Sequence, residues 1–341
     1  MTITRRDALR GLAALSAVGF AGNLRRQPAA AQENPAAVRL DYAYYSPSSL
    51  VLKTFGWLEE ALQEQGIGVE WVLSAGSNKA NEYLRSEAID FGSTAGSAAL
   101  LARANGSPIR TVYLYSKPEW SAMVVGKDSP LTEVSELKGK KVAATKGTDP
   151  YFFLLRSLDA AGLTGTDVEV VNLQHADGRV ALERGDVDAW SGLDPHMAAS
   201  ELEAGSKLIY RNIDFNTYGF LNAREDFITR YPELAATVIE QYERARQWIL
   251  ENPDEAAQIL ADESKMTLEV ARKVLTERTV LDLDPVPGQT QIDVLTAVIP
   301  IMVNENQVKP GTDLPAVLAE LLAPEIAASV VTTTATATPA A

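Results

Sequence analysis

Apolar positions follow two different periods after residue 37. Val38, Leu40, Tyr42 and Tyr44 alternate with other residues, which is typical of a half-buried strand. From 51 to 62 apolar residues recur every three or four positions, which predicts one face of a helix that Gly66 ends. A turn rich in serine separates the two patterns, so the region predicts a strand followed by a helix.

The same unit repeats as far as residue 115. Strands are expected at 69–73, 89–92 and 109–115, with helices between them and turns rich in Ser, Gly and Asn. Alternating strands and helices of this length imply a parallel sheet with covering helices. Ligands of such sheets bind at the carboxyl ends of the strands, so the turns are the places to look for a site.

A second series of strands and helices runs from about residue 120 to 210. Its expected strands lie at 123–125, 142–145, 168–172, 187–190 and 208–210. From Pro232 onward the pattern is mostly helical, with an apolar stripe between 234 and 249. Such helices need a sheet to cover, so we expect them to return to the first series. The segment 331–341, rich in Thr, Ala and Pro, is expected to be unstructured.

Composition supports two domains and excludes some classes of partner. The chain has 341 residues, 46% hydrophobic and 22% charged, which is enough for two cores. Its formal net charge of −14 opposes contact with phosphate backbones, so nucleic acid is excluded as an expected partner. The chain contains no cysteine, so thiol nucleophiles and disulfides are also excluded.

The first residues have the pattern of an export signal. Arg5-Arg6 precede a weakly apolar stretch from 11 to 21, and Ala29-Ala30-Ala31 supplies a small-residue cleavage pattern. The paired arginines favour the twin-arginine route, and the apolar stretch is shorter than the roughly 20 residues that cross a bilayer. Removal of 1–31, with five Arg and one Asp, changes the net charge from −14 to −18. We therefore expect a periplasmic or otherwise extracytoplasmic protein.

Signatures of catalysis are missing from the sequence. Neither a P-loop, nor G-x-G-x-x-G, nor H-E-x-x-H occurs, and the nearest nucleophile elbow, residues 92–96, has Thr94 at its centre. His175 and His196 are interpreted as solvated or capping side chains, because neither has a second histidine at metal-ligand spacing. The sequence therefore predicts no catalytic residue, no metal and no cofactor.

Four turns rich in Ser, Thr and Gly each lie between an expected strand and the next helix. They are 46–49, 74–78, 93–97 and 146–149. Helix N-termini carry unpaired N–H groups, so convergent ones form an anion site. Each turn taken alone is equally explained by ordinary helix capping.

The order and the residues of several segments resemble those of one family of transport proteins. They are Tyr83-Leu84 with Ile89-Asp90-Phe91-Gly92-Ser93-Thr94; Leu137-Lys138-Gly139-Lys140-Lys141-Val142-Ala143; Lys146-Gly147-Thr148; Leu154-Leu155-Arg156 with Gly162-Leu163; and Ala176-Asp177 with Gly185-Asp186-Val187-Asp188-Ala189-Trp190 and Asp194-Pro195. The combination resembles the periplasmic substrate-binding proteins of ABC importers for aliphatic sulfonates, taurine and nitrate. The resemblance covers roughly residues 38–326.

The resemblance implies an α/β, bilobal periplasmic-binding-protein fold in which two α/β lobes surround a ligand cleft. Lobe I would hold residues 38–118 and 220–330, the latter helical and packed on it, and lobe II residues 119–219. Carried over by position, the ligand would touch Tyr45, Ser46, Ser48, Ser49, Ser93, Thr94, Thr148, Asp149, Trp190 and Asp194, with Trp120 and Tyr218 near the hinge. The implied partners are a small anionic or zwitterionic ligand and an ABC permease in the membrane, and we expect a monomer.

Asp149 departs from the small neutral residue that the family suggests, so the ligand's polarity is open. Asp149-Pro150 and Asp194-Pro195 each read as an N-cap followed by proline at the first helical position. Two carboxylates at the cleft would favour a zwitterionic aminosulfonate over an alkanesulfonate of equal length, unless both aspartates only cap their helices. Nitrate and a thiamine-precursor pyrimidine stay open as ligands, and so does the role of an exported enzyme.

Overall fold

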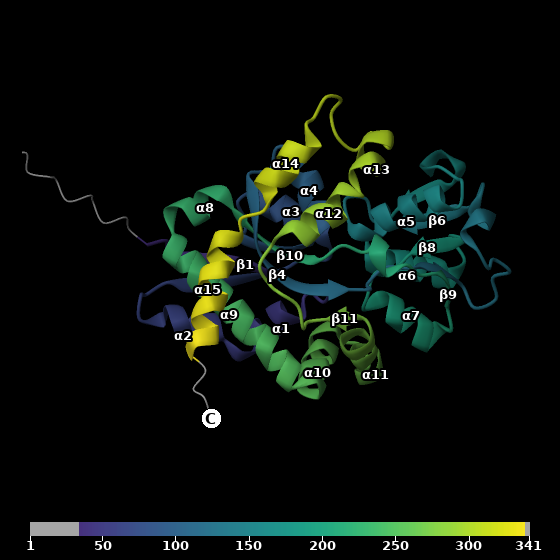
Figure 1. The fold of residues 1–341 in the computed structure, drawn as a ribbon. Coiled ribbons are helices and arrows are strands. Elements are labelled where there is room, and N and C mark those ends of the chain that lie inside the picture. The colour runs from purple at the N-terminus through teal and green to yellow at the C-terminus, as the bar shows by residue number, and fades with distance from the viewer. Residues whose placement is uncertain (1–33, 338–341) are drawn as a thin grey trace, which may run out of the picture. The chain divides into compact units, whose positions relative to one another are not determined.

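Two β-sheets organise residues 34–337, the part of the chain that the computed structural model describes (Figure 1). In this part the first sheet has six strands in the order β11-β4-β10-β3-β1-β2. They are β1 (Ala37–Tyr42), β2 (Gly68–Leu73), β3 (Phe91–Ala95), β4 (Ile109–Pro118), β10 (Gly219–Arg224) and β11 (Thr279–Val280). We refer to this sheet with its helices as lobe I.

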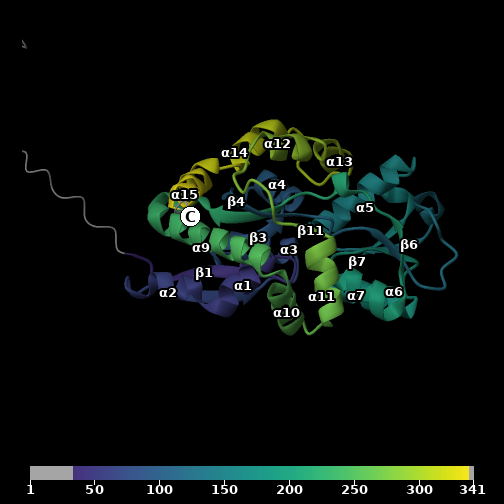
Figure 2. The same cartoon turned by 60° about the horizontal axis from the view of Figure 1, so that its bottom comes forward.

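The helices of lobe I cover both faces of its sheet. They are α1 (Pro47–Phe55), α2 (Trp57–Gln63), α3 (Ser77–Arg85), α4 (Gly96–Ala104), α8 (Glu225–Arg230), α9 (Pro232–Glu251), α10 (Pro253–Ser264), α11 (Leu268–Arg272), α12 (Gln289–Thr296), α13 (Ile299–Asn304), α14 (Leu314–Leu321) and α15 (Pro324–Ala337). Tyr113 of β4 packs with α1 and α9, whereas its neighbour Leu114 packs with α4, α12 and α14 on the other face. Figure 2 shows α12 and α14 on one side of the sheet and α1 and α2 on the other.

Lobe II is built on the second sheet, which has the order β7-β6-β8-β5-β9. Its strands are β5 (Met123–Val125), β6 (Lys141–Ala144), β7 (Glu169–Asn172), β8 (Ala189–Ser191) and β9 (Lys207–Tyr210), and its helices are α5 (Asp149–Ala160), α6 (His175–Arg184) and α7 (His196–Ala204). The chain passes from lobe I to lobe II between residues 118 and 123 and returns between 210 and 219. Within residues 34–337, no helix is long and apolar enough to cross a membrane.

Most expected elements are present, and the helices after residue 232 pack against the first sheet as expected. Leu234, Val238, Tyr242 and Ile249 are buried in the same cluster as β1 and β4. The exact limits of the lobes stay a prediction. The expected export signal, 1–31, lies outside the described residues.

Three expectations about local structure were wrong. The single helix from 51 to 66 is two helices, because Gly56 adopts a left-handed φ of 66° that ends α1. Both sheets are mixed rather than parallel: β10, which the periodicity did not indicate, runs antiparallel to β3 and β4, and β5 runs antiparallel to β8 and β9. The expected unstructured tail is helical as far as Ala337, where α15 ends. Residues 338–341 lie outside the described part.

Candidate functional site

A cavity of about 130 Å³ lies between the two lobes. It is lined from lobe I by Tyr44, Tyr45, Leu73, Ser74 and Ala75, and from lobe II by Gln174, Ala176, Leu193, Asp194, Pro195 and His196. These residues follow the carboxyl ends of β1, β2, β7 and β8, which is where ligands of α/β sheets bind. Among the described residues that line the cavity, neither lysine nor arginine occurs.

Three of the four serines predicted for the site form one buried network beside Tyr45. The Tyr45 hydroxyl donates to the Ser93 carbonyl at 3.0 Å, and Ser93 Oγ donates to Ser46 Oγ at 3.3 Å. Ser49 Oγ donates to the Ser46 carbonyl at 2.7 Å. Ser48 Oγ, in the first turn of α1, is buried without a hydrogen bond. Of these residues, Tyr45 lines the cavity, and the contact of the serines with a ligand stays a prediction.

Thr94 and Trp120 belong to the same region. Thr94 Oγ1 accepts a hydrogen bond of 2.7 Å from Asn222 Nδ2 and donates to the Ala95 carbonyl at 3.0 Å. The Trp120 ring meets Tyr45 edge-on, with ring centroids 6.1 Å apart. Both side chains are buried, and Trp120 packs in the same cluster as Tyr45.

Both carboxylate oxygens of Asp149 accept hydrogen bonds, and the donors come from three parts of the chain. Its Oδ1 accepts from Ser97 Oγ of α4 and from Thr217 Oγ1 at 2.8 Å. Its Oδ2 accepts from Trp120 Nε1 at 2.9 Å and from the Thr217 backbone N–H at 2.7 Å. Burial raises the pKa of Asp149, and these donors oppose that rise. Asp149 therefore joins lobe II to lobe I and to both chain crossings.

The predicted helix caps need correction. Thr148, not Asp149, is the N-cap of α5, and its Oγ1 donates to the Thr145 carbonyl at 2.6 Å. Pro195, not Asp194, is the N-cap of α7, although Asp194 Oδ1 accepts a hydrogen bond from the Ala198 N–H at 2.9 Å. The sequence misplaced the first cap because the proline at the second helical position looks like one at the first.

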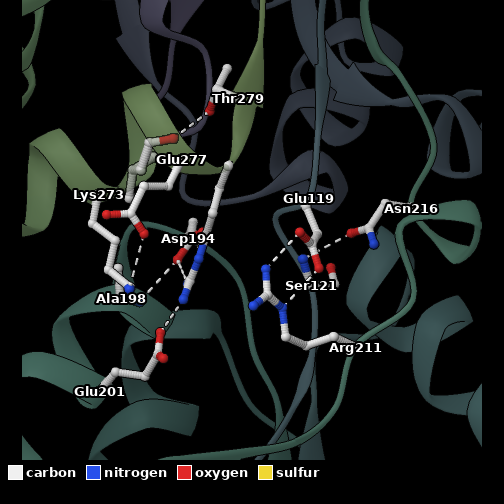
Figure 3. Close-up of polar contacts among 12 residues, drawn as sticks. Glu119, Ser121, Asp194, Ala198, Glu201, Arg211, Asn216, Lys273, Glu277 and Thr279 are labelled. Atoms are coloured by element: carbon white, nitrogen blue, oxygen red, sulfur yellow. Dashed lines mark hydrogen bonds and ion pairs between the residues drawn. The ribbon is translucent and has the colours of Figure 1, made fainter.

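Asp194 also forms a buried ion pair between the lobes. Arg278, which precedes β11, approaches Asp194 Oδ1 at 3.2 Å and also pairs with Glu201 of α7. Figure 3 shows Asp194 and Glu201 among these polar contacts. Burial raises the pKa of Asp194 to about 6, and the charge of Arg278 opposes that rise. Because Arg278 is paired with the Asp194 carboxylate, its positive charge is not free to bind a ligand.

Polar contacts also tie together the two crossings between the lobes. Asn216 Oδ1 accepts from the Ser121 N–H at 2.8 Å, and Arg211 Nη2 pairs with Glu119 at 2.7 Å (Figure 3). Each contact joins the segment leaving lobe I to the segment returning to it. They define a paired hinge beside the cavity.

Trp190 and Tyr218 do not line the cavity, so their predicted ligand contacts stay predictions. Tyr218 lies in the segment that returns to lobe I, as expected for a residue near the hinge. Trp190 packs inside lobe II with Ala181 and Met197, and its ring lies against Gly178. Tyr218 packs with Phe152 in the cluster under α12 and α14. An aromatic residue at a strand end serves a core as readily as a site, so position alone did not separate the two.

Several residues at the site were missed or read differently from the sequence. Asp41 of β1 is buried without a cationic partner among its described contacts, and burial raises its pKa to about 7. Gln174 lines the cavity, and His175 is buried rather than solvated, with its pKa lowered by burial to about 3. Asp41 lies on the opposite side of β1 from alternating apolar residues such as Val38 and Leu40, so the periodicity gave no signal of its burial.

A sequence model described as NMT1/THI5 like matches residues 56–256. A protein of Escherichia coli (strain K12) assigned as an aliphatic sulfonates-binding protein is 29% identical over 262 residues, covering 76% of this chain and 82% of that protein. The taurine-binding periplasmic protein of the same organism is 26% identical over 197 residues, covering 56% and 61%.

Solved structures share the fold. The alkanesulfonate-binding protein SsuA from Xanthomonas axonopodis pv. citri, bound to MOPS, superposes with a TM-score of 0.76 at 23% identity, covering 85% of this chain and 98% of that one. The desulfurization enzyme DszB has the same fold at a TM-score of 0.64 and 14% identity, covering 88% of this chain and 100% of that one. The two lobes and the cavity between them define a protein of the bilobal solute-binding class. The chain belongs to the NMT1/THI5-like family.

Proposed function

We propose that this chain is the substrate-binding protein of an ABC importer and takes a small sulfonate-like ligand between its lobes. The observation that carries the proposal is the cavity formed jointly by the ends of β1, β2, β7 and β8. Its volume of about 130 Å³ limits the ligand to a small molecule. Family membership and the ligands named for its relatives support a sulfonate.

The anionic end of the ligand has a place at the N-terminal turn of α1. Ser48 Oγ lies there without a hydrogen bond, next to the turn that positions Tyr45. The first N–H groups of a helix and its partial positive charge stabilise an anion. Closure over the cavity would rotate lobe II about the paired hinge at Glu119–Arg211 and Ser121–Asn216.

Solute binding accounts for the cavity better than catalysis does. Asp194 is held by Arg278 and by the Ala198 N–H, so it is not poised to move a proton. Burial lowers the pKa of His196 to about 4, which makes it neutral and weakly basic at pH 7. We propose delivery of the ligand to a membrane permease by a monomer outside the cytoplasm.

A thermal-shift panel tests the proposed function. It would contain taurine, alkanesulfonates, nitrate, sulfate and pyrimidines, each at a concentration series up to saturation. A ligand present at 100 times its Kd adds about 2.7 kcal/mol to the free energy of unfolding, which raises the melting temperature by several degrees. We expect a sulfonate to give this shift. A shift with nitrate or a pyrimidine alone, or with no member, would contradict the proposal.

A further inference from the structure

Hydrogen-bond acceptors without partners gather where the two lobes meet. Gln174 Oε1 and Ser74 Oγ are buried atoms of cavity-lining residues, and neither forms a hydrogen bond. Asn78 Oδ1 and His175 Nε2 are also buried and unpartnered. A Cβ placed on Gly76 would lie 2.8 Å from Asn78 Oδ1 and 2.9 Å from His175 Nε2, so both atoms border the same turn of lobe I.

The hydrogen-bond network fixes the role of His175. Thr145 Oγ1 donates its hydrogen to the Leu173 carbonyl at 2.6 Å, so its contact of 3.1 Å with His175 Nδ1 needs the hydrogen on Nδ1. His175 Nε2 is therefore an acceptor. The ring faces lobe I with a lone pair and not with an N–H.

Asp41 also makes the cavity favour ligands that donate hydrogen bonds. Its Oδ1 accepts from the Ser93 N–H at 2.8 Å, while Oδ2 is buried without a hydrogen bond. Burial raises the pKa of Asp41 to about 7, and the nearby Ser74 hydroxyl, itself without a hydrogen-bond partner among the described residues, opposes that rise. When the Ser74 hydroxyl turns its hydrogen toward Asp41, it presents lone pairs to the cavity. The carboxylate behind it also favours positive charge there.

We propose that the cavity wall formed by Ser74 and Gln174 receives an amino group of the ligand, so that the protein selects a zwitterionic aminosulfonate. This inference rests on the proposed function. An ammonium group supplies three N–H donors to a wall that offers acceptors and no lysine or arginine among the described lining residues. The selection comes from these residues and not from Asp149 or Asp194, whose carboxylates are already bonded within the protein.

Calorimetry on matched ligands tests the inference. Taurine and ethanesulfonate differ by the amino group, and the variants would be Gln174→Met, Gln174→Glu and the control Gln63→Met on the exposed face of α2. We expect the native protein to prefer taurine by at least about tenfold, which is the size of one hydrogen bond to a charged group. Gln174→Met should reduce that preference, Gln174→Glu should increase it, and Gln63→Met should leave it unchanged.

The outcomes separate this inference from the proposed function. Equal affinity of the native protein for both ligands, or equal losses for both in Gln174→Met, would overturn the amino-group site while leaving sulfonate binding intact. If neither sulfonate binds, β-alanine and propionate provide the same amino-group comparison on a carboxylate. A preference for β-alanine that Gln174→Met reduces would support the amino-group site without the sulfonate, and no binding of either acid would overturn it. Melting temperatures of the variants show that each is folded.

Discussion

The carboxylates beside the cavity have different consequences because their surroundings differ. Asp149 accepts four hydrogen bonds, Asp194 has a cation, and Asp41 has one donor and an unpartnered oxygen. A buried carboxylate costs free energy unless hydrogen bonds or opposite charges compensate it. Asp149 is therefore expected to stabilise the fold, whereas Asp41 is expected to destabilise it at neutral pH.

Replacing Asp149 by asparagine should lower the free energy of unfolding by about 2–4 kcal/mol. An amide nitrogen would face donors such as the Trp120 N–H and the Thr217 N–H, which both need an acceptor. Urea denaturation measures the loss, with Asp159→Asn at the exposed end of α5 as the matched control. Equal stability of the two variants would show that Asp149 is not the junction described here.

Replacing Asp41 by asparagine should stabilise the protein in a manner that depends on pH. Burial raises the pKa of Asp41 to about 7, so the folded protein keeps a proton that the unfolded chain releases near pH 4. The contribution of Asp41 to the free energy of unfolding is therefore greatest below about pH 4 and is lost as the pH rises through about 7. Asp41→Asn keeps an acceptor for the Ser93 N–H and cannot ionise.

The expected gain from Asp41→Asn is about 1–3 kcal/mol at pH 8 and close to zero at pH 4. Thermal unfolding from pH 4 to 8 measures it, with Asp177→Asn on the exposed surface of α6 as the control. A difference that does not change with pH would contradict the assignment of this titration to Asp41.

Among the elements, the position of helix α6 depends on the close contact between Gly178 and the Trp190 ring. A Cβ on Gly178 would lie 2.7 Å from Trp190 Nε1, which is too close without a shift of the buried ring. Gly178→Ala should therefore destabilise the protein by about 1–3 kcal/mol, although alanine is the better helix former. Urea denaturation tests this, and Gly126→Ala, whose Cβ would meet nothing within 4 Å, should be neutral. A stabilised Gly178→Ala protein would show that helix propensity outweighs the packing.

Periodicity identified elements well where one face is exposed and poorly where both are buried. The stripe of α9 was predicted because solvent-facing residues separate its apolar positions. Strand β10 is buried at every position, so Gly219–Arg224 has no alternation to detect. Gly56 was missed for a different reason, since a helix that breaks and restarts keeps nearly the same apolar face on both sides.

The sequence predicts the turns that lie near the cavity, but it does not predict which carboxylates stay unpaired. Tyr45 and Ser46 meet Ser93 because they follow β1 and Ser93 lies in the neighbouring strand β3. Which carboxylate is free depends on partners distant in sequence, such as Arg278 for Asp194 and Thr217 for Asp149. Such pairings arise only when the chain returns from lobe II to lobe I.

At the scale of the whole molecule, two sheets of different strand order share one cavity and a paired hinge. The cavity takes residues from both lobes, so a bound molecule would contact both at once. The ion pair of Arg278 with Asp194 and the hydrogen bonds of Asp149 already join the lobes near that position. This arrangement is the basis for proposing that ligand binding and lobe closure are coupled.

Equilibrium dialysis with labelled taurine tests the central claim most directly, on the native protein and on Ala176→Trp, which fills the cavity from its lobe II side. Ala160→Trp, on the exposed end of α5, serves as the control for an added indole. The proposed function predicts that the native protein and the control each retain one taurine per chain at saturation and that Ala176→Trp retains none. No retention by the native protein, or equal retention by Ala176→Trp, would contradict a sulfonate site between the lobes.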